Sequence, residues 1–320
     1  MKSVMKISNT AHVGVVMLCL VCFTACDSDK IYQEEQYKNV VYLLSGSENV
    51  YTEGYTLNET EPVRYFSVGI GGTNPNEDEI TVTLVPDDVL LNQYNSSNFD
   101  IDESKFARLL PANRYEIESY TVTIPAQPED QYVKVPVRVR PRGLSPDTIY
   151  FIPIAIKSVS RYEVNQDKYN MLYRVTIEND YAQQRVITYY TKKGTETNQS
   201  SGSFTIMSGA KIVQPLMKNM VRLFAGNYTQ GQTTTVADIH RYAIMVQIND
   251  DNTIDFFPYG SIEVEKIEAK DYNIYDPKVK QGDLEYRVMY LSYRYRILNS
   301  NGTRGAWMET KESLTRVEEN

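Results

Sequence analysis

The chain contains very little cysteine, histidine or tryptophan. Among its 320 residues there are three cysteines, two histidines and one tryptophan. All cysteines lie within the first 26 residues, which leaves no thiol further on for a disulfide, a thiolate metal site or a cysteine nucleophile. After His12 the sole histidine is His240, and no Gly-x-Ser-x-Gly motif occurs. The sequence therefore does not favour a Ser-His-Asp triad or a zinc site built on histidines.

Basic runs are absent as well. The formal net charge is −8, and no long stretch of Lys and Arg occurs. Nucleic acid is therefore not an expected partner, and the acidity mainly favours solubility. The acidic turn at Asp250-Asp251-Asn252 lacks the glycine and the glutamate of an EF-hand loop, so it does not predict a calcium site. Neither a metal site nor a cofactor is expected.

The first 26 residues have the pattern of a secretory leader. Lys2 and Lys6 precede an apolar run over Val13–Phe23, and Thr24-Ala25-Cys26 follows. A run of this length is too short to span a bilayer comfortably. The Thr-Ala-Cys ending resembles a bacterial lipobox, although Phe23 stands where leucine is usual. This resemblance implies a signal peptide over residues 1–25 and a lipid on the sulfur of Cys26.

The residues after Cys26 predict the location of the protein. Asp27-Ser28-Asp29 resembles the acidic tag that directs lipoproteins of the Bacteroidota to the outer face of the outer membrane. The alternative is an acidic linker that carries no targeting signal. A multi-acyl anchor holds a folded domain on a membrane without a spanning helix. We expect residues 26–39 to be the lipid anchor and a polar tether.

A first β domain is predicted over residues 40–180. Tyr132–Arg140 alternates with period two and places four valines on one face, which is typical of a half-buried strand. Pro136 lacks an N–H group, so we expect this strand to lie at a sheet edge or to be bulged. One short helix is predicted from Pro86 to Asn95. The other predicted strands are Tyr65–Ile70, Ile80–Val85, Tyr120–Pro125, Ile149–Lys157 and Leu172–Glu178.

The order of segments in this domain resembles a known family. Thr81–Asn95, Leu109–Tyr115, Thr121–Ala126 and Tyr150–Ile156 succeed one another as in an N-terminal domain of unknown function found in Bacteroidota surface lipoproteins. These proteins are encoded near polysaccharide-utilisation genes, and the same domain precedes some family-18 glycosidase-like domains. The resemblance implies an immunoglobulin-like β-sandwich and a role in glycan capture beside a TonB-dependent transporter and its partner lipoprotein. It transfers no catalytic residue.

A second β domain is predicted over residues 181–320. The segment Asn273–Lys278, before a long tyrosine-rich strand, resembles the C-terminal domain that accompanies the first one, and an antiparallel barrel or sandwich is expected. The 26 tyrosines suit β-sheet surfaces. The predicted strands are Arg185–Thr191, Ser203–Met207, Met220–Ala225, Tyr242–Ile248, Ile254–Phe257, Ser261–Ala269, Leu284–Leu298 and Trp307–Val317. The whole mature chain is therefore predicted to be all-β.

Six residues of the second domain are candidates for glycan binding. Aromatic rings stack on the apolar face of a sugar while polar neighbours bind its hydroxyls. In the long strand, the row Met289, Leu291, Tyr293, Tyr295 and Ile297 is expected to face the core. The opposite row then faces water. The candidates are Trp307, Tyr286, Tyr290, Arg294, Tyr228 and Tyr259, and the alternative for each is ordinary packing between strands.

The expected function is glycan binding without catalysis. A glycosidase needs two carboxyl groups across a cleft, whereas the acidic pairs here are adjacent in turns. Asp147-Thr148-Ile149 resembles a short acceptor motif for O-linked glycans, although a turn explains it equally well. A surface adhesion or fimbrial subunit that uses strand addition is the alternative, and a glycoside hydrolase is less favoured.

Overall fold

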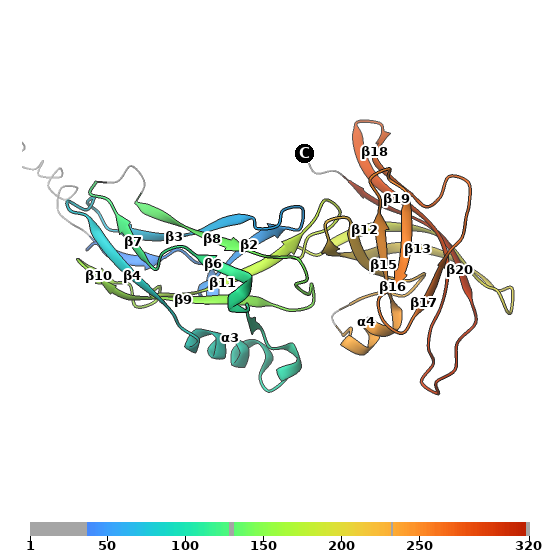
Figure 1. Cartoon of the computed structure of the whole chain (residues 1–320), viewed down its shortest axis with the longest axis horizontal. Coiled ribbons are helices and arrows are strands. Elements are labelled where there is room, and N and C mark those ends of the chain that lie inside the picture. The colour runs from blue at the N-terminus through green and yellow to red at the C-terminus, as the bar shows by residue number, and fades with distance from the viewer. Residues whose placement is uncertain (1–36, 128–130, 232, 318–320) are drawn as a thin grey trace, which may run out of the picture.

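The computed structural model describes residues 37–127, 131–231 and 233–317, which form two β domains placed end to end (Figure 1). The signal peptide and Cys26 lie outside the described residues. Within the described ranges, no helix has the length and apolar character needed to cross a membrane. The prediction of an all-β, two-domain protein is confirmed.

The first domain is a sandwich of two sheets. One sheet has the order β10 (Glu163–Val164), β1 (Val40–Leu43), β3 (Val63–Gly71), β8 (Tyr132–Val139) and β6 (Tyr115–Ile117). The other has the order β2 (Val50–Thr56), β11 (Asn170–Glu178), β9 (Tyr150–Val159), β4 (Ile80–Pro86) and β7 (Thr121–Ile124), and β5 (Arg108–Leu109) pairs with β9. The pairs β1–β10, β2–β11 and β5–β9 are parallel.

The core of the sandwich follows from strand alternation. On β8, Val135, Val137 and Val139 are buried between the sheets, while Lys134 and Arg138 are exposed, as the period-two pattern predicts. Tyr55 and Tyr173 place their hydroxyl oxygens 2.7 Å apart in this core, and the Tyr55 hydroxyl lies 3.1 Å from the carbonyl oxygen of Val137. These contacts satisfy buried polar atoms and link the two sheets.

A helix covers part of one outer face of the sandwich. α3 (Val89–Phe99) packs Leu91 against Phe151 of β9 and Leu172 of β11 (Figure 1). The short helix predicted near residues 86–95 is therefore present, although it ends later than expected. Three single-turn 3₁₀ segments occupy Ser47–Asn49, Glu103–Lys105 and Ala112–Arg114.

The second domain is a single curled sheet. Its order is β16 (Ile254–Pro258), β15 (Ala243–Ile248), β14 (Met220–Phe224), β13 (Phe204–Met217), β12 (Thr188–Asn198), β20 (Met308–Val317), β19 (Leu284–Arg296) and β17 (Glu263–Lys266), and β18 (Ile274–Gln281) also pairs with β19. β16 and β17 lie side by side, so the sheet forms a nearly closed antiparallel barrel. α4 (Val236–Tyr242) lies at its side (Figure 1).

The barrel interior confirms the predicted face of the long strand. Met289, Leu291, Tyr293 and Tyr295 of β19 are fully buried. They share a core with residues of the other strands, including Tyr190, Val213, Val221, Ile244 and Leu314. The core of the first domain extends to Ile177, and the core of the barrel begins at Ala182.

Pro136 does not mark an edge or a bulge. β8 lies inside its sheet between β3 and β6, and its register against β3 shows no shift. The short strand β6 ends opposite Val137, so it does not reach Pro136. The expectation of an edge strand was wrong because a neighbour that stops early accommodates a proline without a bulge.

Candidate ligand-binding cleft between the domains

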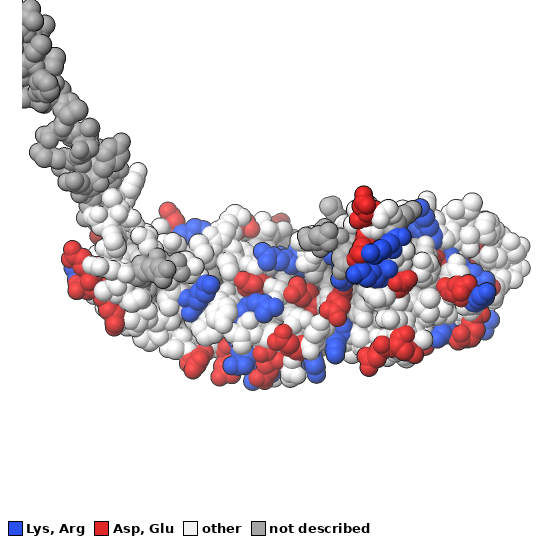
Figure 2. Space-filling view, turned by 90° about the horizontal axis from the view of Figure 1, so that it is seen from above, with Lys and Arg blue, Asp and Glu red and all other residues white. Residues whose placement is uncertain are grey.

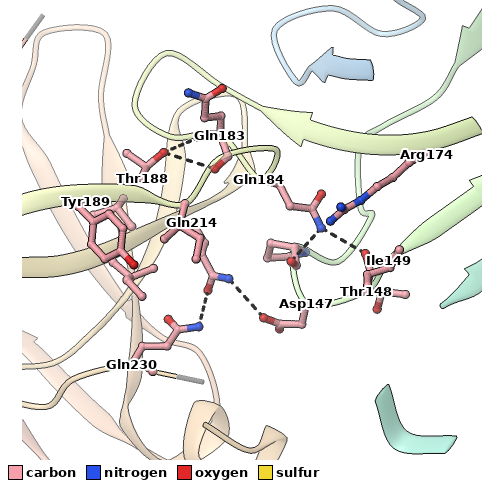
Figure 3. A pocket seen from close by; sticks show the side chains of 15 residues that line it. Asp147, Thr148, Ile149, Arg174, Gln183, Gln184, Thr188, Tyr189, Gln214 and Gln230 are labelled. Carbon is pink, nitrogen blue, oxygen red and sulfur yellow. Dashed lines mark hydrogen bonds between the residues drawn. The ribbon is translucent and has the colours of Figure 1, made fainter. Parts of the chain in front are cut away.

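A cleft of about 340 Å³ lies where the two domains meet (Figure 3). Its size is at the lower end of the usual range for ligand pockets. The first domain supplies the loop between β8 and β9 and one side chain of β11, and the second supplies the start of β12, part of β13 and the loop after β14. Its described lining residues are Pro146, Asp147, Thr148, Ile149, Arg174, Gln183, Gln184, Ile187, Thr188, Tyr189, Ile212, Val213, Gln214, Gln230 and Gly231.

Gln184 fixes one wall of this cleft. Its side-chain amide nitrogen donates to the carbonyl oxygens of Pro146, at 2.9 Å, and Thr148, at 3.2 Å. Its side-chain oxygen accepts from the backbone N–H of Ile177 at 3.1 Å. One amide side chain thus ties the linker between the domains to the β8–β9 loop, and the cleft is preformed rather than assembled from mobile loops.

An ion pair between the domains adjoins the cleft, because one of its partners, Asp147, is a lining residue. Both nitrogens at the end of Arg222 bind the carboxylate of Asp147, at 2.7 and 2.5 Å, in a fork-to-fork arrangement. Arg222 is almost completely buried, and it also binds Gln214. The ring of Tyr259 lies 4.6 Å from its guanidinium carbon. Asp147 is therefore a structural partner of Arg222, which gives the Asp-Thr-Ile segment a role that needs no attached glycan.

A second hollow of about 400 Å³ adjoins the cleft and shares Gln230 and Gly231 with it. Its wall includes Tyr228 and Tyr242, whose rings stack with centroids 4.2 Å apart. The remaining described lining is mostly hydroxyl and amide side chains, together with Asp238. The two hollows form one continuous concave surface around the loop at residues 226–231.

A buried polar network inside the barrel holds this loop. Lys211 binds both oxygens of Glu312 at 2.7 Å and the carbonyl oxygen of Gly226 at 2.9 Å. The backbone N–H of Gly226 donates to the Tyr293 hydroxyl at 2.7 Å, and that hydroxyl donates to Glu312 at 2.8 Å. These groups are nine-tenths buried or more. The loop therefore has a fixed position at the barrel end.

Two further side chains complete the network beside Asn227. Lys192 donates to the side-chain oxygen of Asn227 at 2.8 Å, and Glu196 accepts the hydroxyl of Tyr295 at 2.7 Å and the backbone N–H of Asn227 at 3.2 Å. Gly226 has a φ of +51°, and a Cβ there would overlap Glu196 and Tyr295. Only glycine fits this position, because the backbone is left-handed and the network approaches it closely.

Burial dominates the ionisation of this network. It lowers the pKa of Lys211, and the neighbouring Glu312 opposes that shift. Burial also raises the pKa of Tyr293 and of Tyr295 well above the usual range, and the carboxylates of Glu312 and Glu196 add to these shifts. The phenols consequently stay neutral and act as hydrogen-bond donors. The described residues hold no group of His, Cys, Asp and Glu suited to a metal ion.

Two of the sequence-predicted residues lie together, away from the cleft. The ring of Trp307 is half-buried against Arg294 and Arg296, each with its guanidinium carbon 4.6 Å from the ring centroid. Arg294 binds Glu265 and Arg296 binds Glu263, both at 2.5 Å, on the outside of the barrel. The ring of Trp307 thus contacts two arginine side chains of the protein itself.

The other predicted residues are dispersed. Tyr286 and Tyr290 are half-buried on β19, and Tyr290 lies edge-to-face with Tyr272 at 6.4 Å. Tyr259 packs on Arg222, the partner of Asp147, and Tyr228 lines the second hollow. Tyr228 is therefore the predicted residue that lies on the concave surface, and Tyr259 contacts it only through Arg222.

Sequence reasoning missed the residues that line the cleft. Its polar side chains include Asp147, Arg174, Gln183, Gln214 and Gln230, which no local motif connects. One signal in the sequence was an aromatic residue, Tyr189, close to the predicted domain boundary. The structure leaves 54% of its surface exposed.

Comparisons with known proteins agree with this architecture. Two models of one family type match, one for an N-terminal domain over residues 37–163 and one for a C-terminal domain over residues 169–315. No curated protein matches. A Bacteroides ovatus structure of unknown function is similar, with a TM-score of 0.68, 17% identity and coverage of 87% of this chain and 94% of the other.

Two further solved structures share the fold. A multidomain protein from Bacteroides ovatus that includes DUF1735 has a TM-score of 0.64, 16% identity, and coverage of 87% and 94% of the two chains. An auxiliary nutrient binding protein from Bacteroides thetaiotaomicron has a TM-score of 0.60, 14% identity, and coverage of 85% and 92%. The chain therefore shares the two-domain, all-β fold of these Bacteroides structures, and it matches the N-terminal and the C-terminal domain model of one family type.

Proposed function

We propose that this protein is a lipid-anchored surface protein that binds glycan at the junction of its two domains, without catalysis. The observation that carries the proposal is the interdomain cleft, a preformed concave surface with an exposed tyrosine and several amide side chains. Tyr189 offers a ring to a sugar face, while Gln183 and Gln230 offer donors and acceptors to hydroxyl groups.

The chemistry of the cleft favours binding over hydrolysis. Asp147 is the single carboxylate among the described lining residues, and both of its oxygens bind Arg222. Glycoside hydrolysis ordinarily needs two carboxyl groups that flank the scissile bond. A carboxylate held by a buried arginine suits a structural role better than proton transfer.

The arrangement of the domains suits an anchor at Cys26. β10 and the start of β1 lie at the end of the first domain that is remote from the barrel (Figure 1). A lipid before residue 37 would thus leave the cleft and the barrel facing away from the membrane. On one face, Lys and Arg are interspersed with Asp and Glu, which suits a soluble surface domain (Figure 2).

The similarity to a nutrient binding protein supports this proposal at the level of fold. We further propose that the bound glycan is passed to a TonB-dependent transporter and its partner lipoprotein in the outer membrane. Co-purification of that transporter with the native lipoprotein tests the partnership, and recovery of the lipoprotein alone from gently solubilised membranes would contradict it.

Affinity electrophoresis of residues 27–320 tests glycan binding directly. The protein is run in gels that each contain one plant or host polysaccharide. At least one polysaccharide should slow its migration. Tyr189→Ala should abolish the retardation, because it removes the stacking surface. Trp307→Ala is the matched control, since it removes an aromatic ring from the outside of the barrel, and it should leave retardation unchanged. Normal mobility of the folded wild type on every gel would contradict the proposal.

A further inference from the structure

One cation in the cleft has no hydrogen-bond or ion-pair partner among the residues that the structure describes. Arg174 projects from β11 on the outer face of its sheet, because its neighbours Tyr173 and Val175 are buried in the sandwich core. Figure 3 shows its guanidinium pointing toward Gln184 and the cleft. Its Nε–H is buried and donates to no acceptor among the described residues, and no described carboxylate forms an ion pair with it.

The other charges of the cleft are already balanced. Asp147 and Arg174 are the two ionised groups in the described lining, and Arg222 neutralises Asp147 in an ion pair. The cleft therefore carries one uncompensated positive charge. A half-buried guanidinium that lacks hydrogen-bond acceptors is unfavourable, and an anion that enters the cleft would supply them.

We infer that the cleft takes an acidic glycan, in which the carboxylate of a uronic acid residue pairs with Arg174. A guanidinium fork matches a carboxylate with two parallel hydrogen bonds. This inference rests on the proposed function and names the class of sugar. The uronate lies at Arg174, and the neighbouring sugars extend past Tyr189 toward Gln230 and the second hollow.

The geometry also limits what else the ligand contacts. Both the oxygen and the nitrogen of the Gln184 side-chain amide form hydrogen bonds with backbone groups, so Gln184 is a positioning residue. Gln230 donates to Gln214 at 3.3 Å, a long bond that a sugar hydroxyl can replace. Arg174 is consequently the one strong anchor, and the amides add orientation.

A matched pair of ligands tests the inference. Calorimetric titration of residues 27–320 with oligogalacturonate, and with its fully methyl-esterified form, compares the same sugar with and without charge. The acid should bind about tenfold to a hundredfold more tightly, the range expected for a hydrogen-bonded charge. Arg174→Gln should remove this difference, and Arg174→Lys should restore part of it.

The control is Arg138→Gln, which removes an exposed arginine from the opposite sheet and should change neither affinity. Thermal unfolding of each variant confirms that it is folded. Equal binding of acid and ester, or an unchanged affinity in Arg174→Gln, would overturn the inference but leave glycan binding intact. Binding of sulfated glycans in preference to uronates would also overturn it. Failure to bind any glycan would instead refute the proposed function.

Discussion

Four long ionisable side chains occupy the interior of the barrel, where aliphatic residues would be the usual choice. Lys192, Lys211, Glu196 and Glu312 are all buried, and each has a hydrogen-bonded partner. Burial of charge is unfavourable unless the partners are well placed. The network is best understood as the support of the Gly226–Asn227 loop, because its bonds converge there.

Removal of one partner should therefore be costly. Glu312→Gln leaves the Lys211 ammonium buried without its carboxylate, and should lower the free energy of unfolding by about 3 kcal/mol. Glu309→Gln, on the outward face of the same strand, should change it by less than about 0.5 kcal/mol. Urea denaturation measures both. Equal stability of the two variants would show that the buried pair does not support the barrel.

The same polar residues limited the sequence prediction. Strand β12 turns Tyr190, Lys192 and Glu196 inward, so its interior face is partly charged. Hydrophobic alternation fades after Tyr190, and the predicted strand over Arg185–Thr191 captured only the first part of β12. On β19 the inward row is apolar, and the same reasoning correctly predicted that Met289, Leu291, Tyr293 and Tyr295 are buried. It did not predict the burial of Val288 and Ser292 in the opposite row.

Among the secondary-structure elements, the hairpin of β15 and β16 is tied to β17 by one carboxylate. Its turn, predicted from Asn249–Thr253, is confirmed by the pairing of Ile248 with Ile254. Asn249 donates to the carboxylate of Asp255 at 2.8 Å, and Lys266 of β17 donates to the same group at 3.2 Å. Asp255 thus links the hairpin to the strand beside which the barrel closes.

Asp255 should make stability depend on pH in the acid range. The hydrogen bond from Asn249, followed by that from Lys266, lowers the pKa of its carboxyl. The folded state therefore holds the proton less tightly than the unfolded state. The stabilisation is present above the ordinary Asp pKa, and is lost as the pH falls from about 4 through the folded pKa.

Melting temperatures of wild type and Asp255→Asn between about pH 2.5 and 6 measure this effect. The wild type should melt higher at pH 6, and the gap should shrink as the pH falls. Asp250→Asn is the control from the same hairpin. A gap that stays constant over this range would exclude the proposed linkage.

Helix α4 was not predicted, because its sequence is too short to show helical periodicity. It has seven residues, and a helix this short depends on its cap more than on apolar periodicity. Thr235 and Asp238 form a reciprocal capping box, with bonds of 3.1 and 2.9 Å. The Thr-x-x-Asp spacing was visible in the sequence, but a run of threonines obscured it.

At the scale of the whole molecule, the junction decides what the protein can do. The two-domain, all-β plan could be predicted from strand alternation within each half. The cleft could not, because its walls join side chains from distant segments, such as Asp147, Arg174 and Gln230, whose proximity exists only after the domains have docked.

The docking itself should depend on the Asp147–Arg222 pair. Asp147→Asn leaves the buried Arg222 without its carboxylate, and should destabilise the protein by about 1–2 kcal/mol. It should also increase the range of domain orientations, which small-angle scattering detects as a larger radius of gyration. Arg140→Gln breaks the exposed pair with Glu61 and serves as the control. Identical scattering profiles for wild type and Asp147→Asn would contradict this role.

Hydrogen exchange measured with and without a bound oligosaccharide tests the central claim most directly. If glycan binds between the domains, exchange should slow in peptides that cover residues 145–149, 183–190 and 226–231, and stay unchanged near Trp307. Protection confined to Trp307 and the outer face of β19, with no change in the cleft, would contradict the account.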